Sequence, residues 1–260
     1  MTREERMATQ PIGRLMAGMT LPAILAQIIN ILYSIIDRIY IGHMEGVGAN
    51  ALTGVGVTFC ITVFISAFSA FISNGAAPLA AIWLGKGDRE HAEKILGNSV
   101  SFLMLCTVAL MTFFYAFQRP LLYMFGASDA TIGYAMDYLS IYLLGTLFVE
   151  LALGLNAFII CQSQPRIAMF SVLIGAVANI VLDPVFIFGL HMGVKGAAIA
   201  TVISQGLSAA WVMSFLLGKK TSLKVRRSCM RLEGRILGSV FSLGISPFIM
   251  NATESFISIV

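Results

Sequence analysis

The chain has 260 residues, of which 58% are hydrophobic and only 12% are charged, and its formal net charge is +4. Soluble domains carry roughly 25% charged residues, so this chain has too little polar side chain to cover a soluble surface. The composition therefore excludes a soluble enzyme, a disordered chain and a nucleic-acid binder. The four cysteines are widely spaced and form no CxxC pair, which argues against a disulfide framework or a zinc site. We expect an all-α polytopic membrane protein, because helices satisfy their own backbone hydrogen bonds within a bilayer.

Apolar stretches long enough for membrane-spanning helices, which need roughly 20 residues, follow one another along the chain. Six are complete, and they cover residues 15–41, 51–84, 92–118, 131–160, 166–189 and 195–217. A seventh begins near residue 236 and still runs at residue 260. We expect a helical bundle of six complete transmembrane helices and part of a seventh.

Polar and helix-breaking residues separate these stretches. The segment Gly85-Lys86-Gly87-Asp88 is expected to end the second helix, and Arg119-Pro120 is expected to end the third. The second stretch is longer than an upright span requires, so its helix should tilt, bend or project from the bilayer. Gly75 and Pro78 are the expected bending points within it.

The basic residues predict the orientation, because cytoplasmic loops of membrane proteins are enriched in lysine and arginine. With the N-terminus in the cytoplasm, fourteen of them lie on the inside and only Arg119 and Lys195 lie in outside loops. Seven of the fourteen fall within residues 219–235. We interpret that run as a basic cytoplasmic linker rather than as a dedicated lipid or nucleic-acid patch.

A weak internal repeat supports a division of the chain. A shift of 225 residues aligns Pro247 with Pro22, and each proline lies about ten residues into a span that follows a basic segment. Transporters are often built from paired repeats with the binding site between them. We therefore expect residues 1–218 to form one lobe of a two-lobe transporter, residues 219–235 the linker, and residues 236–260 the start of a second lobe, whose remainder is missing from this sequence.

Acidic residues within the apolar stretches are costly, at roughly 2.5–3.5 kcal/mol each near the bilayer centre, and therefore need an explanation. They are Asp37, Asp137, Glu150, Asp183 and Glu254. Asp137 lies near the end of its span and can reach the interface. Glu150 and Asp183 lie too deep in their spans to reach the interface, which indicates a buried polar site.

Polar side chains form stripes at helical spacing in three of the spans. The stripes consist of Gln27, Asn30, Ser34 and Asp37; of Asn179 and Asp183; and of Thr201, Ser204, Gln205 and Ser208. At 1.5 Å per residue, Asp37, Asp183 and Thr201 all fall in the outer half of the bilayer. Pro184 cannot donate a backbone hydrogen bond, which frees the carbonyl of Ile180 beside them. We predict that these groups meet at a site for a proton or Na⁺; the alternative is a buried polar network that only fixes helix packing.

Several segments of the chain resemble the multidrug and toxic compound extrusion (MATE) family of cation-coupled efflux transporters. They are Leu21-Pro22, Tyr33-Ser34-Ile35-Ile36-Asp37, Gly75-Ala76-Ala77-Pro78, Asn179-Ile180-Val181-Leu182-Asp183-Pro184 and Gly193-Val194-Lys195-Gly196-Ala197-Ala198-Ile199-Ala200-Thr201. The resemblance covers nearly the whole chain. Relatives often carry a basic residue after the fourth helix, where this chain has Cys161-Gln162-Ser163-Gln164-Pro165.

The resemblance implies twelve helices in two six-helix lobes around a cavity that opens alternately to each side. It implies that Asp37 and Asp183 bind the coupling ion, H⁺ or Na⁺, and that Asn179 and Thr201 are neighbouring ligands. If the ion is Na⁺, these four residues form the metal site. Glu254 matches an acid of the seventh helix that some branches use. The candidates for lining a substrate cavity are Gln27, Asn30, Ser34, Glu150, Gln205 and Glu254. Phenylalanine and then methionine are the expected wall residues.

The expected function is antiport: export of lipophilic organic cations across a bacterial inner membrane in exchange for H⁺ or Na⁺, with no other cofactor. One alternative is a lipid-linked oligosaccharide flippase of the same superfamily, whose cavity should be lined with arginine. A membrane-embedded enzyme would need a nucleophile–base or metal constellation, and no histidine lies at membrane depth. We therefore expect no catalytic residue. The remaining alternative is a non-transporting half-transporter fragment.

Overall fold

A computed structural model of the chain describes residues 12–218 and 221–257. Within those residues, seven helices are long and apolar enough to cross a membrane. They are α2 (Ile12–Gly42), α3 (Gly48–Gly85), α4 (Arg89–Met124), α5 (Ile132–Cys161), α6 (Pro165–Pro184), α7 (Val194–Leu217) and α8 (Gly234–Ile257). A π-helical turn, η1 (Val185–Gly189), continues α6, and a short 3₁₀ turn, η2 (Arg227–Cys229), lies between α7 and α8. The predicted all-α membrane bundle is confirmed.

The end of α4 differs from the sequence prediction. We expected Arg119-Pro120 to end this helix, but α4 continues through both residues to Met124. Gly126 ends it instead, with a positive φ of 97°. The amide of Gly126 bonds to the carbonyl of Tyr123, and that of Ala127 to the carbonyl of Leu122. This is the Schellman arrangement, which favours glycine because a side chain is strained at that backbone angle. Pro120 lacks an amide hydrogen and so removes one backbone hydrogen bond of the helix, a loss that membrane helices tolerate.

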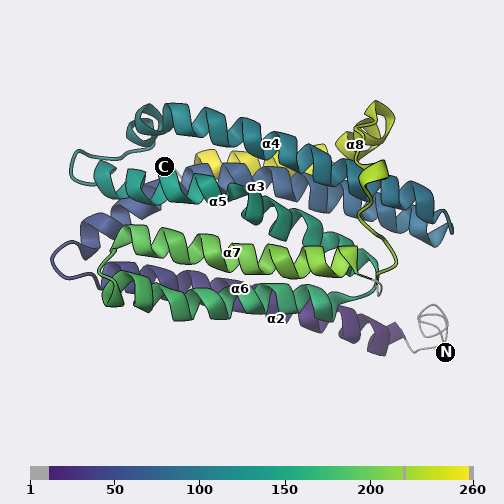
Figure 1. The fold of residues 1–260 in the computed structure, drawn as a ribbon, viewed down its shortest axis with the longest axis horizontal. Helices are drawn as coiled ribbons and strands as arrows, with labels where there is room; N and C mark the ends of the chain where they lie inside the picture. Colours follow the sequence, from purple (N-terminus) through teal and green to yellow (C-terminus); the bar gives the residue numbers. More distant parts are fainter. Residues whose placement is uncertain (1–11, 219–220, 258–260) are drawn as a thin grey trace.

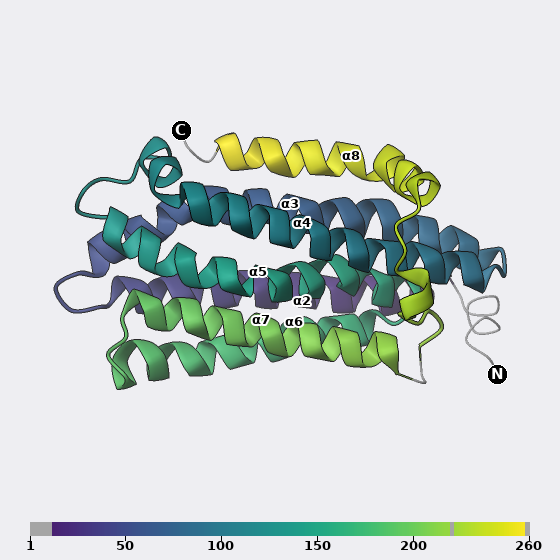
Figure 2. The same cartoon turned by 45° about the horizontal axis from the view of Figure 1, so that its top comes forward.

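The helices lie side by side along the long axis of the molecule, and their connections lie at its two ends (Figure 1). The central helix, α5, packs against α3, α4, α6 and α7. On one side of it, α2 packs against α6 and α6 against α7, whereas α3 packs against α4 and α8 on the other. Figure 2 shows the turn between α3 and α4 reaching beyond the ends of α5 and α7. Whether this long second helix tilts, bends or projects relative to a bilayer stays a prediction.

Gly75 marks the closest approach of α3 to α8. A Cβ atom at this position would lie 2.7 Å from the carbonyl oxygen of Val240 and 3.0 Å from the Cα atom of Gly244. We expected Gly75 to be a bending point of the helix. The structure also gives it a packing role, because only a residue without a side chain lets the two backbones meet. Phe71 and Phe248 flank this crossing, with ring centroids 6.3 Å apart.

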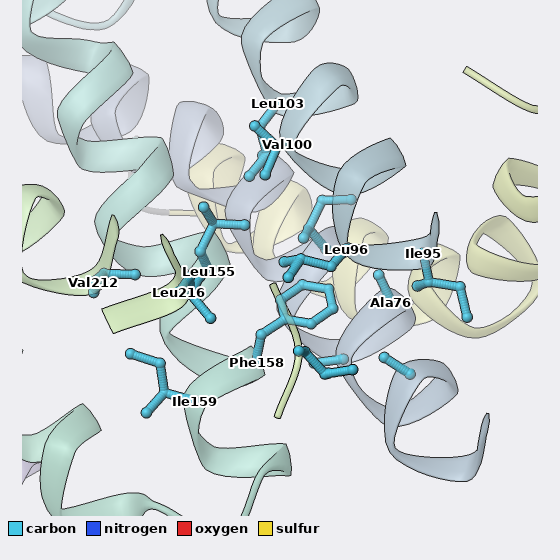
Figure 3. Packing of buried hydrophobic residues seen from close by; sticks show 14 of the residues in the cluster. Ala76, Ile95, Leu96, Val100, Leu103, Leu155, Phe158, Ile159, Val212 and Leu216 are labelled. Carbon is cyan, nitrogen blue, oxygen red and sulfur yellow. The ribbon is translucent and has the colours of Figure 1, made fainter. Parts of the chain in front are cut away.

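Two hydrophobic clusters fill the interior, one toward each end of the bundle. Figure 3 shows the cluster toward the end that contains the α7–α8 connection, where Leu96 of α4, Leu155 and Phe158 of α5 and Leu216 of α7 converge. The other cluster contains Ile41, Leu139 and Val194. Such packing holds α5 in the centre of the bundle, so the polar side chains of α5 occupy fixed positions.

The connection between α7 and α8 is packed against the bundle rather than standing free of it. The side-chain oxygen of Gln162 accepts hydrogen bonds from the hydroxyl of Thr221 and the amides of Ser222 and Leu223, at 2.7, 2.7 and 3.1 Å. Further along, Asn98 on α4 accepts a bond of 2.7 Å from the amide of Glu233. We refer to residues 221–233 as the linker segment and to this end of the molecule as the linker end. Four of the basic residues that we expect on the cytoplasmic side lie outside the described residues. They are Arg3, Arg6, Lys219 and Lys220.

Candidate cation site and cavity

The site begins on α6, where Asn179 and Asp183 lie one helical turn apart. Their side chains are 2% and 0% exposed. The amide nitrogen of Asn179 donates to Asp183 Oδ1 at 3.1 Å. Asp183 is followed by Pro184, the last residue of α6, and the chain continues as the π-helical turn η1. Because proline has no amide hydrogen, the helical bond to Ile180 is lost there, and wider turns of this type are frequent at functional sites.

Asp37 of α2 completes an acidic pair. It is half-buried, and its carboxyl group lies next to that of Asp183. Asp37 Oδ1, Asp183 Oδ2 and Asn179 Oδ1 are buried atoms without a hydrogen-bond partner. Among the described residues, no lysine or arginine forms an ion pair with either carboxylate. Oxygen atoms of this kind fit a proton or a hard cation such as Na⁺.

Arg38 is the charged side chain that follows Asp37 in sequence. It is exposed, and its guanidinium lies over the ring of Phe59 on α3, 5.6 Å from the ring centroid. Within the described residues, Arg38 forms no ion pair with Asp37. The acidic pair therefore has a cation nearby but none that neutralises it by direct contact.

A cavity of about 650 Å³ lies beside the acidic pair, between α2, α3, α5 and α7. A second, narrower space of about 40 Å³ follows it between α2, α5, α6 and α7. Thr201 of α7 lines both spaces, and so does Tyr33 of α2. The two spaces expose the site predicted from the polar stripes to small molecules and to water.

The structure brings most of the predicted residues to these spaces. Asn30, Asp37, Thr201 and Gln205 line the larger cavity together with Ser34, and Asn179 lines the narrower space. Asp183 lies behind this wall, bonded to Asn179. Three predicted cavity residues lie elsewhere. Gln27 and Glu254 are exposed on α2 and α8, and Glu150 is fully buried among α3, α4 and α5.

Three tyrosines line the site that were not predicted from the sequence. Tyr33 lies one turn before Asp37 on α2, and Tyr138 and Tyr142 of α5 stack with ring centroids 6.1 Å apart and an interplanar angle of 17°. The hydroxyl of Tyr138 faces Thr201. All three line the larger cavity, whose lining within the described residues contains Phe59 and no methionine. The signal was present in the spacing of Tyr138 and Tyr142, which places both on the face of α5 that points toward Asp37.

Comparisons with known proteins agree with this arrangement. The MatE family model matches residues 22–185. The multidrug export protein MepA of Staphylococcus haemolyticus is 26% identical over 239 residues, which cover 92% of this chain and 52% of MepA. MepA of Staphylococcus aureus strain MRSA252 is 24% identical over 255 residues, covering 96% of this chain and 55% of the relative. This chain thus spans about half the length of the curated relatives it matches.

Solved structures give the same picture. A chain described as protein A is 32% identical with a TM-score of 0.90, and the match covers 98% of this chain and 57% of that one. An outward-facing MATE family transporter of the MOP superfamily has a TM-score of 0.88 at 22% identity, over 98% of this chain and 56% of the other. The fold of this chain is accordingly that of one half of the solved transporters.

Proposed function

The chain belongs to the MatE family of multidrug and toxic compound extrusion transporters, and on that basis we propose that it supplies the N-terminal lobe of a secondary active efflux transporter. The transporter exports lipophilic organic cations in exchange for H⁺ or Na⁺. The observation that carries this proposal is the pair of half-buried Asp37 and buried Asp183, which forms no ion pair with a basic residue within the described part of the chain and lies beside a cavity of about 650 Å³.

The pair is suited to ion coupling because its two negative charges are energetically costly when no ion is bound. Two carboxylates in contact repel each other, and both lie in a membrane-spanning part of the chain where charge is expensive. One bound proton or Na⁺ removes part of that cost. Asn179 Oδ1 and the hydroxyl of Thr201 supply further oxygen atoms at the edge of the same site. Binding of the ion and the packing of α2 against α6 are therefore linked.

The cavity is suited to an organic cation. Its lining combines Asp37 with the rings of Tyr33, Tyr138 and Tyr142, and aromatic faces attract cations by about 0.5–2 kcal/mol each. The flippase alternative would need a basic wall that holds phosphate groups. Arg38 is the one lysine or arginine in the lining of the two spaces within the described residues, so the structure offers no observation in favour of that alternative.

The proposed cycle uses the proline of α2. Pro22 lies within this helix, and prolines are frequent points of bending. Binding of H⁺ or Na⁺ at Asp37 and Asp183 removes their repulsion, lets α2 repack against α6 and expels the drug outward. The membrane potential can drive such a step, because one elementary charge that crosses 100 mV supplies about 2.3 kcal/mol.

The second lobe is the proposed partner. Helix α2 and helix α8 bury few of their apolar residues within this chain. Exposed apolar residues on α8 include Phe241, Ile245 and Ile249. We propose that a C-terminal lobe covers α8 in the complete transporter and that the protein lies in the bacterial cell membrane with its linker end in the cytoplasm.

The test is a dye-efflux assay of the complete transporter with Asp37→Asn and Asp183→Asn variants. We expect both variants to lose efflux at least tenfold and to lose the dependence on the coupling ion. Asp137→Asn is the matched control, because Asp137 is an acid of α5 that pairs with Lys195 at 3.5 Å near the surface. Wild-type efflux and ion dependence in both site variants would refute the proposal. Titration of efflux with Na⁺ at fixed pH identifies the coupling ion.

A further inference from the structure

Buried polar atoms without a hydrogen-bond partner mark two places in the bundle. Nine such side-chain atoms occur within the described residues. Four belong to the candidate cation site, on Asp37, Asn179, Asp183 and Ser204. Four others form a second group, consisting of both carboxyl oxygens of Glu150 and the hydroxyl oxygens of Ser69 and Thr107. Unpaired buried polar atoms are uncommon in folded proteins and call for an explanation.

The second group lies where α3, α4 and α5 meet. Glu150 is 0% exposed, and the hydroxyl of Ser69 on α3 faces its carboxyl group. One turn further along α5, a Cβ atom at Gly154 would lie 2.7 Å from Leu103 of α4 and 3.7 Å from the Cα atom of Ser69. Because α4 and α5 run in opposite directions (Figure 1), Thr107, one turn beyond Leu103, lies level with Glu150.

Among the residues that the structure describes, no cation faces this carboxyl group. Helix α3 carries no charged residue, α5 carries only Asp137 besides Glu150, and α7 carries only Lys195. On α4 the nearest charged residues are twelve or more positions from Cys106. Helix α6 carries Arg166 and Asp183, one near each of its ends. The titratable groups that lie near Glu150 are Cys106 of α4 and Tyr142 of α5, and neither carries a positive charge.

We propose that Glu150 is a proton-binding site of its own, separate from the site at Asp37 and Asp183. The carboxylate binds one proton (H⁺) supplied by the aqueous phase and becomes neutral, and the resulting O–H group donates to the hydroxyl oxygen of Ser69. An isolated buried carboxylate is so costly that such a group neutralises instead. A proton fits better than Na⁺, because Glu150 lines neither of the two spaces beside the cation site and a proton needs no coordination volume.

The same face of α5 connects the two sites. Tyr138, Tyr142, Thr146 and Glu150 follow at intervals of four residues and are each 7% exposed or less. Tyr138 and Tyr142 line the cavity beside Asp37. From Tyr138 to Glu150 the helix rises roughly 18 Å toward the linker end. The proton on Glu150 is thus held at the inner end of a buried polar stripe that begins at the cation site.

Infrared spectroscopy of the purified 260-residue chain with ¹³C-labelled glutamate tests this site and does not depend on transport. We expect a carboxylic-acid C=O band that shifts with the glutamate label and persists at pH 8, where exposed acids are ionised. The band should be lost in Glu150→Gln and retained in Glu93→Gln. Glu93 is a matched control because it is also buried but pairs with Arg226 at 2.9 Å.

The absence of a label-sensitive band at pH 8 in the wild-type chain would overturn the proposal, whether or not Glu150→Gln folds. A band that survives in Glu150→Gln would do the same. Ser69→Ala gives a third measurement. It should raise the C=O frequency, because the acid loses its hydrogen-bond acceptor, and an unchanged frequency would contradict the proposed bond. Loss of efflux coupling in the transport assay has no bearing on these outcomes, so the two proposals fail separately.

Discussion

Asn179 donates its side-chain amide to Asp183 at 3.1 Å, one turn away on the same helix, while one oxygen of each residue stays without a partner. The hydrogen bond fixes the carboxyl group of Asp183 toward Asp37 rather than toward lipid. It also turns the carbonyl oxygen of Asn179 away from Asp183, where it can accept from or bind another group. Asn179 thus orients the acidic pair and adds an oxygen atom to it.

Asn179→Ala should therefore weaken binding of the coupling ion without unfolding the lobe. A hydrogen bond to a charged group contributes roughly 1.5 kcal/mol, which corresponds to about a tenfold higher ion concentration for half-maximal efflux. Efflux by the complete transporter is measured at graded Na⁺ concentrations and at graded pH. Asn74→Ala is the control, since Asn74 is exposed on α3 and bonds only to Ala70 of its own helix at 2.9 Å. An unchanged ion dependence in Asn179→Ala would remove Asn179 from the site.

Two glycines of α8 should respond in opposite ways to alanine. A Cβ atom at Gly244 would lie 2.7 Å from the carbonyl oxygen of Phe71, whereas one at Gly238 meets no atom within 4 Å. Gly244→Ala should cost about 1–3 kcal/mol, because the two helices must move apart. Gly238→Ala should be neutral or stabilising by up to about 1 kcal/mol, since alanine is the better helix former. Thermal unfolding in detergent measures both, and equal shifts would contradict the close crossing of α3 and α8.

The positions of the helices could be predicted from the sequence because apolar length alone decides which segments enter a bilayer. The polar stripes could also be found, since residues three or four positions apart share a helix face. Those stripes led to Asp37, Asn179, Asp183 and Thr201, which the structure brings to one place. Their role in ion coupling stays a prediction until the variants are measured.

Features that depend on contacts between distant segments could not be predicted. Glu93 lies in the polar first turns of α4, yet it is 3% exposed because residues more than 130 positions later cover it. Gln162 is buried for the same reason, since its side-chain oxygen accepts three hydrogen bonds from residues 221–223. Glu150 was expected at the substrate cavity. Its sequence position gives its depth in the membrane but does not show which neighbouring helices its side chain faces. The packing of α5 against α3 and α4 sets that direction.

The orientation of the linker segment is testable by thiol labelling. We expect Ser228→Cys to react with a membrane-impermeant maleimide only in inside-out vesicles. Ala130→Cys, in the loop between α4 and α5, should react in intact cells. Both positions are exposed. The loop between α4 and α5 and the connection between α7 and α8, which contain them, lie at opposite ends of the bundle (Figure 1). The four native cysteines are first replaced by serine or alanine. Labelling of both positions from the same side would contradict the predicted topology.

Glu93 should anchor the linker segment to α4. Its carboxylate lies 3.2 Å from Nε of Arg89 and 2.9 Å from Nε of Arg226, and it also accepts a long bond of 3.4 Å from the amide of Lys224. Loss of a buried partner leaves charged groups uncompensated, which costs roughly 3–5 kcal/mol when both groups are buried. Since the arginines are half exposed, we expect Glu93→Ala to cost about 2 kcal/mol.

Glu90→Ala provides the matched control for this anchor, because Glu90 is an exposed glutamate on the same helix that pairs with Lys94 across one turn at 3.0 Å. Exposed pairs of this type contribute little, so its thermal stability should stay near that of the wild type. Limited proteolysis gives the second readout: in Glu93→Ala the protease should cut the linker segment at its arginines faster than in Glu90→Ala, because Arg226 is released from α4. Equal cleavage rates in the two variants would show that the hydrogen bonds to Gln162 and Asn98 hold the linker segment without Glu93.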